Sequence, residues 1–333
     1  MYKVAIIGFG SSGQRFLALV HALSPQIEVV VCTARSLQTK GARVVSSLRQ
    51  VVDFEPDLVV ISGSAAARAE TIEGLPLGLK GIFVEKPLAR SMAEGTLAAE
   101  ALRARAGVVE IGYNLRFSPS LIDFRKRIHH QVYGATHGVR VETGQYLPTW
   151  RPERDYRTTV SSRADSGGGV LLELSHEFDY LNWMFGRPLW VSANVGKVSN
   201  LEIDVEDQAM LHMGFRPNHS ASNVSASLNL DFVRRDATRT CTLIGDRGSL
   251  KWDCITGVVQ RFDIEQNKWL ETFSQSESGA ISYLNEWSHL IDCIHGKDRP
   301  LISGQDGKNV LSIIEACWKS ASNSQRQDVN YGD

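Results

Sequence analysis

A glycine-rich turn between an apolar strand and a helical pattern constrains the fold of this chain most. Residues 2–7 read Tyr-Lys-Val-Ala-Ile-Ile and lead into Gly8-Phe9-Gly10-Ser11-Ser12-Gly13. In a Gly-x-Gly-x-x-Gly turn, the first glycine permits a tight turn, the second lets a pyrophosphate approach the backbone, and the third lets the helix pack on the strand. The free N–H groups and dipole of the following helix suit a phosphate anion. This context predicts a dinucleotide site at residues 8–13.

Residues 1–117 alternate between strand-like and helix-like segments, which predicts a parallel sheet covered by helices on both faces. Four further segments, at 27–32, 57–61, 81–84 and 108–112, are apolar on both faces, as buried parallel strands are. The first helix is expected to close at Ser24-Pro25. Ser91-Met92-Ala93-Glu94 is a capping box that opens an alanine-rich helix ending near Gly107.

Residues 118–333 follow a different pattern. Ser118-Pro119 is typical of a helix start. Residues 224–232 alternate between apolar and polar side chains, and Gly245-Asp246-Arg247-Gly248 predicts a hairpin turn, so an antiparallel sheet is expected. The segment 310–318 predicts a final helix. The expected domains are therefore 1–117, which binds the dinucleotide, and 118–333, which binds substrate and forms oligomers.

Composition excludes several classes of partner. Lys and Arg number 36 and Asp and Glu 37, a net charge of −1, which favours neither a nucleic acid nor a membrane surface. The five cysteines are scattered without ligand spacing, so we expect reduced thiols and no metal. No apolar run is long enough to span a bilayer, and a strand that begins at residue 2 leaves no room for a signal peptide. We expect a cytoplasmic protein.

Two side chains are candidates for acid–base chemistry. Lys86, in Glu85-Lys86-Pro87, ends a predicted central strand, at the edge where open α/β sheets bind ligands. A desolvated lysine there can donate to a substrate oxygen, with Glu85 holding it; a surface Glu–Lys pair is the alternative. His176 follows a flexible turn at residues 167–169, on a predicted helix whose face it shares with Glu173 and with Asp179 or Tyr180. A packed helical turn with ordinary acidic residues is the alternative there.

These motifs, together with Gly112-Tyr113-Asn114-Leu115-Arg116-Phe117 and in this order, resemble the glucose–fructose oxidoreductase/inositol dehydrogenase (Gfo/Idh/MocA) family over the whole length. The resemblance implies an α/β protein with an N-terminal Rossmann domain and a C-terminal α+β domain whose open, mostly antiparallel sheet often forms dimers. It also implies nicotinamide-dependent redox at a sugar or polyol carbon. Lys86 then resembles the catalytic lysine, His176 the proton-transferring histidine, and Asn114 a residue near nicotinamide and substrate.

Two positions depart from the family pattern. Many members have an aspartate four residues before the histidine, where this chain has Leu172, and Glu173 stands three before it. We assign Glu173 a supporting catalytic role. Arg68 stands where a histidine is common, in the loop that starts at Ser62. The expected cofactor-binding residues are Gly8, Phe9, Gly10, Ser11, Ser12, Gly13, Thr33, Arg35, Ser36, Ser62, Gly63, Ser64, Glu85, Lys86 and Asn114.

The residues after the second strand indicate which nicotinamide is bound. A carboxylate that would accept from the ribose 2'-hydroxyl of NAD is missing from 32–36, whereas Thr33, Arg35 and Ser36 suit a 2'-phosphate. We predict a preference for NADP over NAD.

An arginine-rich block, residues 146–157, suggests an anionic, sugar-like ligand, although its arginines could equally pair with Glu153 and Asp155 in a solvated loop. The block resembles a family branch associated with bacterial surface-glycan and sialic-acid-like sugars, which implies an acidic or nucleotide-linked sugar. The expected substrate contacts are Lys86, Asn114, Arg116, Trp150, Arg151, Arg154, Tyr156, Arg157, His176 and Asp179.

The leading hypothesis is an NAD(P)-dependent sugar dehydrogenase or reductase that forms a homodimer or homotetramer. One alternative is an enzyme that holds NAD tightly and uses it transiently to epimerise a sugar or cleave a glycosidic bond. A second is a catalytically silent dinucleotide-binding regulator, which would have no reason to keep both Lys86 and His176.

Overall fold

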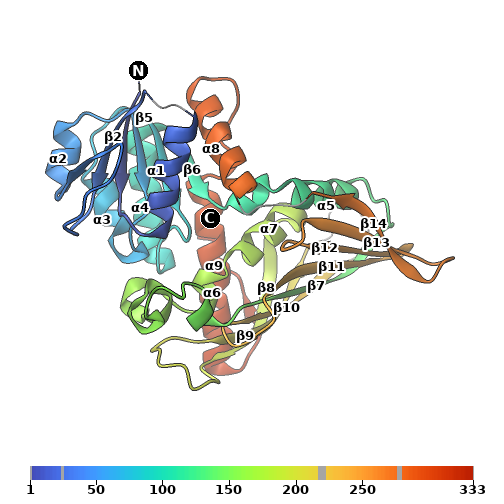
Figure 1. Ribbon diagram of the computed structural model, residues 1–333. Helices are drawn as coiled ribbons and strands as arrows, with labels where there is room; N and C mark the ends of the chain where they lie inside the picture. The colour runs from blue at the N-terminus through green and yellow to red at the C-terminus, as the bar shows by residue number, and fades with distance from the viewer. Residues whose placement is uncertain (1, 24–25, 217–222, 276–279, 333) are drawn as a thin grey trace. The chain divides into compact units, whose positions relative to one another are not determined.

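The computed structural model describes residues 2–23, 26–216, 223–275 and 280–332 (Figure 1). The chain forms two compact units. Unit 1 comprises Met1–Tyr113 and Leu284–Leu311, and unit 2 comprises Asn114–Tyr283 and Ser312–Asp333. Within the described ranges, every helix is too short or too polar to cross a membrane.

Unit 1 contains a six-stranded, entirely parallel sheet in the order β3-β2-β1-β4-β5-β6. This is the strand order of a doubly wound dinucleotide-binding fold, and the predicted fold class is confirmed. Sequence periodicity found every strand except the short β3. The strands are β1 (Lys3–Ile7), β2 (Glu28–Cys32), β3 (Arg43–Val45), β4 (Leu58–Ile61), β5 (Leu79–Glu85) and β6 (Ala106–Gly112).

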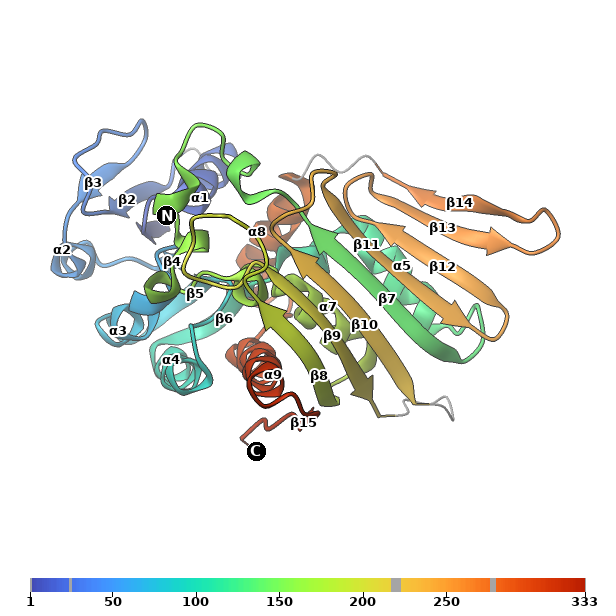
Figure 2. The ribbon, with the colours of Figure 1, turned by 90° about the horizontal axis from the view of Figure 1, so that it is seen from below.

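Helices cover both faces of this sheet, with α1 and α8 on one side and α3 and α4 on the other (Figure 2). On the α1 and α8 side, Phe16 packs against Phe83, with ring centroids 4.6 Å apart, and against Trp287, with centroids 5.8 Å apart. Alternate residues of β1 and β4 complete this core. The helices that lie wholly or partly in unit 1 are α1 (Ser11–Leu23), α2 (Leu48–Asp53), α3 (Arg68–Glu73), α4 (Met92–Arg105), α8 (Ala280–Ile294) and α9 (Gly304–Asn323).

The helix ends in unit 1 follow local capping chemistry. Ser91 caps α4 by accepting from the N–H of Glu94 at 3.3 Å, which confirms the predicted helix start. The Glu94 carboxylate accepts from the N–H of Arg90 rather than from that of Ser91, so the predicted capping box is only half formed. The expected stop at 24–25 lies outside the described residues. Helix α9 is longer than the predicted 310–318, because Ser303 and Asp306 form a reciprocal cap before it.

Unit 2 contains a nine-stranded sheet in the order β14-β13-β12-β11-β7-β10-β9-β8-β15. All its pairs are antiparallel except β7 with β10, so the expected open, mostly antiparallel sheet is confirmed. The predicted hairpin joins β11 to β12 where Gly245 pairs with Gly248. The strands are β7 (Thr136–Gly144), β8 (Pro188–Gly196), β9 (Gln208–Phe215), β10 (Val224–Asp231), β11 (Thr238–Gly245), β12 (Gly248–Asp253), β13 (Val258–Asp263), β14 (Lys268–Ser274) and β15 (Gln327–Asp328).

One face of this sheet is covered by α5 (Pro119–His129) and α7 (His176–Phe185), which follows the short helix α6 (Val170–Glu173) (Figure 2). The fully buried Trp252 of β12 anchors both covering helices. Its indole N–H donates to Ser120 Oγ of α5 at 2.8 Å, and Tyr180 of α7 lies edge-on at 5.6 Å. Helix α7 is thereby held on the core side of the sheet.

Candidate functional site

The glycine turn forms a closely packed cradle between β1 and α1. Gly8 has a φ of +93°, and a Cβ there would lie 2.5 Å from the amide nitrogen of Gly63. A Cβ at Gly13 would lie 2.2 Å from the carbonyl oxygen of Gly8. At Gly10, by contrast, no heavy atom of the described residues lies within 4 Å of a Cβ position. The three glycines thus supply a turn, an open approach and a helix contact, as a pyrophosphate site requires.

These residues fit a dinucleotide. The first-turn N–H groups of α1, at Ser11, Ser12 and Gly13, have no intrahelical acceptor and carry the positive end of the helix dipole. Phe9 and Gly10 form the half-buried crest of the turn. The cradle can therefore hold a pyrophosphate through backbone groups alone.

The loop after β4 closes the other side of the cradle. Ser62 Oγ donates to the Gly8 carbonyl at 2.8 Å, and the Ser62 N–H donates to Ile7 at 2.8 Å. Ser64 caps the short helix at residues 65–67 through the Ala66 N–H. The strand order reverses between β1 and β4, which is where doubly wound sheets bind their ligands.

The residues expected to bind the adenosine ribose lie at the carboxyl end of β2. Thr33 is fixed by its N–H, which donates to Val45 at 3.0 Å, and its hydroxyl accepts from the Arg35 N–H at 3.3 Å. The side chains of Arg35 and Ser36 are exposed. A cationic and two hydroxyl side chains are thus available on one turn.

Lys86 lies at the carboxyl end of β5, half-buried, and its peptide bond to Pro87 is cis. The loop that carries it is tied to the β4 loop by Arg68. The buried guanidinium of Arg68 donates to the Gly63 carbonyl at 3.0 Å and to the Lys86 carbonyl at 3.5 Å. The sequence marked Arg68 only as a departure from the family pattern. Its role in connecting two cofactor-side loops depends on contacts that the sequence does not reveal.

Glu85 contacts the cradle helix. Its carboxylate lies 4.0 Å from the Arg15 guanidinium of α1, and Glu85 itself is buried. Arg15 was not singled out in the sequence. The expectation that Glu85 holds Lys86 stays a prediction.

The helix around His176 is not continuous, which corrects the expectation from the sequence. α6 ends at Glu173, Leu174 has φ −97° and ψ 36°, and α7 starts at His176. Glu173 and His176 therefore do not share the face of one regular helix. The two helices have different anchors: the Glu206 carboxylate and carbonyl hold the first N–H groups of α6, whereas α7 is held by buried ion pairs.

The triple-glycine segment is tightly packed, and its expected flexibility stays a prediction. A Cβ at Gly168 would lie 2.4 Å from the Val160 carbonyl oxygen, and one at Gly169 would lie 2.6 Å from the Glu206 carboxylate. Glycine is needed at both positions, because the Val160 backbone leaves no room for a side chain at Gly168 and the Glu206 carboxylate leaves none at Gly169. The segment fixes the start of α6.

Arg116 and Asp179 form a buried, bidentate ion pair. Arg116 Nε and Nη2 donate to the two carboxylate oxygens of Asp179 at 2.9 and 2.6 Å, and both side chains are at most 3% exposed. The pair joins the short 3-10 helix Asn114–Phe117 to α7. Beside it, Asn114 Nδ2 donates to Ser282 Oγ at 2.7 Å. The structure thus connects the elements that carry Asn114 and His176.

A second ion pair holds α7 on the sheet. Glu177 is fully buried and accepts from Thr143 Oγ1 of β7 at 3.0 Å and from Arg239 Nε of β11 at 2.9 Å. His176, 7% exposed, precedes it. Tyr180 is a core residue, and burial raises the pKa of its hydroxyl well above the usual value. The sequence had no signal for Arg239, which lies far from α7 in the chain.

The arginines of the 146–157 block have separate surroundings. Arg157 pairs with Asp155 at 2.8 Å and Glu202 at 3.0 Å, as the alternative of a solvated loop expected. Arg154 lies 4.0 Å from Glu153. Among the described residues, the Arg151 side chain has no ion-pair or hydrogen-bond partner, and Arg151 is half-buried.

Two aromatic residues of the same block are packed. Trp150 Nε1 donates to the Gln145 carbonyl at 3.0 Å, and its ring lies edge-on to Phe232 at 5.1 Å. Tyr156 accepts from the Glu202 N–H at 3.2 Å. Both aromatic side chains therefore hold the conformation of the 146–157 loop.

Comparison with known proteins agrees with this architecture. Residues 2–113 match the description "Oxidoreductase family, NAD-binding Rossmann fold", and residues 125–330 match "Oxidoreductase family, C-terminal alpha/beta domain". The chain is similar to myo-inositol 2-dehydrogenase of Thermotoga maritima, with 23% identity over 81% of this chain and 79% of the relative. It is also similar to scyllo-inositol 2-dehydrogenase (NAD(+)) of Bacillus subtilis, with 23% identity over 80% and 76%.

Solved structures share the fold. GenD2 from gentamicin A biosynthesis, in complex with NAD, superposes with a TM-score of 0.81 at 23% identity, over 99% of this chain and 96% of that one. Levoglucosan dehydrogenase with NADH gives a TM-score of 0.82 at 18% identity, over 99% of each chain. The WlbA dehydrogenase of Bordetella pertussis, with NADH and UDP-GlcNAcA, gives 0.79 at 18% identity, over 99% of each chain.

Both parts of the chain match the family in chain order, and the glycine cradle fits the dinucleotide that the first part implies. The protein belongs to the Gfo/Idh/MocA family of NAD(P)-binding oxidoreductases.

Proposed function

We propose that the protein interconverts a hydroxyl and a keto group on a sugar or polyol, with a nicotinamide dinucleotide as hydride carrier. The observation that carries this proposal is the placement of Lys86 at the carboxyl end of β5, on the same edge of the sheet as the Gly8–Gly13 cradle. Parallel strands bring their carboxyl ends to one edge, where ligands of doubly wound sheets bind. The bound nicotinamide supplies the site that accepts or donates hydride.

The chain's own residues move the proton and orient the substrate. In the oxidation direction, the carbinol C–H bond breaks with its electron pair leaving as hydride, and the hydroxyl proton passes to a base. Lys86 and His176 are the proposed groups that take this proton and stabilise charge on the substrate oxygen, and Glu173 supports His176. Arg68 fixes the Lys86 loop, and the Arg116–Asp179 pair fixes α7 behind His176.

The proposed cofactor is NADP in preference to NAD. Thr33, exposed Arg35 and exposed Ser36 offer a cation and two hydroxyls at the end of β2, and residues 32–36 contain no carboxylate. A guanidinium binds a 2'-phosphate with charge-assisted hydrogen bonds, whereas NAD is usually held there by a carboxylate.

The proposed substrate is an acidic or nucleotide-linked sugar, of the kind found in surface-glycan or sialic-acid-like pathways. Arg151 and Arg154 support this, because neither is engaged by two carboxylates as Arg157 is. The proposed contacts also include Asn114, Trp150 and Tyr156. The family neighbour WlbA was solved with UDP-GlcNAcA, which is consistent with such a ligand. The proposals of transient NAD use and of a silent regulator have no comparable support, since the named relatives are dehydrogenases.

We also propose that residues 1–117 form the cofactor-binding domain and 118–333 the substrate-binding domain, and that the sheet of unit 2 forms a homodimer or homotetramer. Strand β10 alternates buried and more exposed residues, which leaves one face of the sheet polar and accessible. A cytoplasmic location is proposed because none of the five cysteines, all within the described residues, forms a disulfide.

The proposal is tested with Lys86→Met and His176→Asn. Each substitution should lower kcat by roughly 100- to 10,000-fold, as loss of general acid–base catalysis does, with NADPH affinity changed far less. A matched control is Lys80→Met, which removes a lysine at the other end of β5, where it pairs with Asp57. Full activity in either catalytic-site variant, or no nicotinamide turnover with any sugar, sugar acid or nucleotide sugar, would contradict the proposal.

A further inference from the structure

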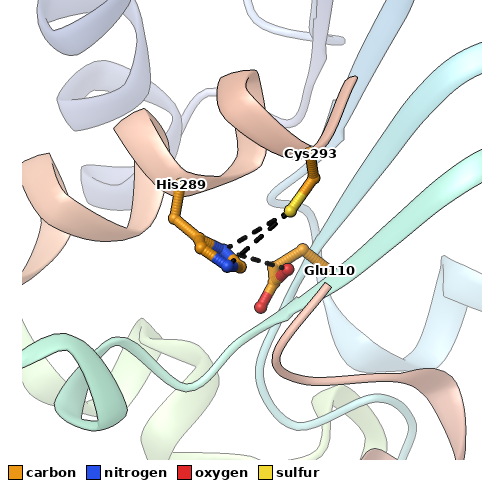
Figure 3. Close-up of side chains that lie close together, drawn as sticks. All are labelled: Glu110, His289 and Cys293. Carbon is orange, nitrogen blue, oxygen red and sulfur yellow. Dashed lines mark hydrogen bonds and ion pairs between the residues drawn. The ribbon is translucent and has the colours of Figure 1, made fainter. Parts of the chain in front are cut away.

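Unit 1 contains a buried group of three side chains that the proposed reaction does not use. Glu110 projects from β6, and His289 and Cys293 project from successive turns of α8 (Figure 3). Their ligand atoms lie within 4.8 Å of one another. Glu110 is fully buried, Cys293 is 5% exposed, and the His289 side chain is 16% exposed. Carboxylate, imidazole and thiolate are the three side-chain types that bind zinc.

We propose that Glu110, His289 and Cys293 bind one divalent, thiolate-accepting metal ion, with Zn²⁺ as the expected ion. The site is separate from the cofactor cradle: β6 is the edge strand of the sheet, and the cradle lies between β1 and β4. The proposal departs from the sequence-based expectation of no metal, because the three ligands come from segments that only the fold brings together.

The distances approach those of a tetrahedral zinc site. His289 Nδ1 lies 3.6 Å from Glu110 Oε2 and 3.8 Å from Cys293 Sγ. Zinc–ligand bonds of about 2.0–2.3 Å at tetrahedral angles place N and O about 3.3 Å apart and N and S about 3.6 Å apart. The two measured separations are therefore close to the bound values. The sulfur-to-carboxylate separation lies within 4.8 Å.

Glu110 supplies an independent reason to expect a cation. One carboxylate oxygen, Oε1, accepts from the Ile302 N–H at 3.1 Å. The other, Oε2, is buried and accepts no hydrogen bond from the described residues, and it points toward His289 and Cys293. A buried carboxylate oxygen without a hydrogen bond is costly unless a charge compensates it. His289 Nδ1, 3.6 Å away, is the ion-pair partner of Oε2, and a metal ion between the two atoms would compensate the carboxylate at shorter range.

Groups around the triad orient its members. His289 Nε2 lies 3.7 Å from Asp298 Oδ2, an ion-pair distance rather than a hydrogen-bond distance. A carboxylate near Nε2 favours Nδ1 as the metal ligand, as in many histidine–metal sites. The Ile302 N–H orients the Glu110 carboxylate by donating to Oε1. Three protein ligands leave a fourth position for water.

Charge also favours a divalent ion. A divalent ion with one thiolate, one carboxylate and a neutral imidazole gives a neutral group, so no net charge is buried.

The test uses the full chain, stripped with a chelator and then given Zn²⁺ alone. Elemental analysis after gel filtration should find one zinc per chain, and zinc should raise the melting temperature while Mg²⁺ does not. Co²⁺ in place of zinc should produce a thiolate-to-cobalt charge-transfer band. Cys293→Ser and Glu110→Gln should weaken zinc binding by at least about 100-fold and abolish that band, and Asp298→Asn should weaken binding by about 10-fold.

The matched control is Cys254→Ser, which removes a half-buried thiol of unit 2. It should bind zinc as the wild type does. Circular dichroism checks that each variant folds, and the cobalt spectrum of the wild type tests the thiolate ligand without any substitution. Absence of stoichiometric zinc, absence of the cobalt band, or equal binding by wild type and Cys293→Ser would each overturn the proposal and leave a Glu–His pair beside a buried thiol.

Discussion

Arg116 and Asp179 hold each other through two parallel hydrogen bonds of 2.9 and 2.6 Å, and both are buried within unit 2. Trp183 adds a ring 5.7 Å from the Arg116 guanidinium. A bidentate pair of this kind fixes the relative orientation of two elements. Here they are the helix that begins with His176 and the turn that begins with Asn114.

Asp179→Asn should lower the free energy of unfolding by about 3–5 kcal/mol, because it leaves the Arg116 charge buried without its partner. Urea denaturation measures this loss. The double variant Arg116→Met, Asp179→Leu should recover most of the stability, since it removes both charges together. A single variant as stable as the wild type would show that the pair is dispensable.

Substitutions at two cradle glycines should affect protein stability and cofactor binding differently. Gly13→Ala introduces a Cβ 2.2 Å from the Gly8 carbonyl and should cost about 1–3 kcal/mol of stability. Gly10→Ala meets no described atom within 4 Å and should fold normally. It should nevertheless weaken NADPH binding by about tenfold or more, because the Cβ occupies the path of the pyrophosphate. Thermal melts and fluorescence titration distinguish the two effects; equal effects of both substitutions would be inconsistent with the assigned roles.

The NADP preference depends on Arg35. Arg35→Ala should weaken NADPH binding by about 10- to 100-fold, the value of one charge-assisted hydrogen bond, and leave NADH binding almost unchanged. The control Arg49→Ala removes an exposed arginine of α2 that pairs with Asp53. A wild type that binds NADH more tightly than NADPH would refute the preference directly.

The arginine block should divide into two groups. Arg151→Ala and Arg154→Ala should raise the substrate KM, because these guanidiniums are the proposed anion contacts. Arg157→Ala should leave KM within about twofold, since Arg157 already pairs with Asp155 and Glu202 and exposed pairs contribute little. Steady-state kinetics on an acidic sugar gives the comparison. If KM stays constant in the first two variants, the block only shapes the loop.

Much of unit 1 was predictable, because its signals are local. The glycine turn, the doubly apolar strands and the cap at Ser91 each occupy a few consecutive residues, and their physical meaning does not depend on distant parts of the chain. The same holds for Ser118-Pro119 and the hairpin at Gly245–Gly248 in unit 2.

The remaining features depend on partners that are distant in sequence. The break at Leu174 has no glycine or proline to mark it; it exists because Glu206 holds α6 while Arg116 and Arg239 hold α7. Likewise, Arg68 gains its role only when the loops after β4 and β5 lie side by side. Propensity cannot anticipate such contacts, because tertiary packing overrides it.

The apolar face that β1, β4 and β5 share with α1 is completed by Trp287 and Leu290 of α8. Residues 1–113 therefore leave the ribosome with the side of Phe16 that Trp287 contacts still uncovered, and it stays so until the segment 284–311 has been synthesised. The nascent dinucleotide domain must wait for almost the whole polypeptide, and during that interval it is a natural client for chaperones.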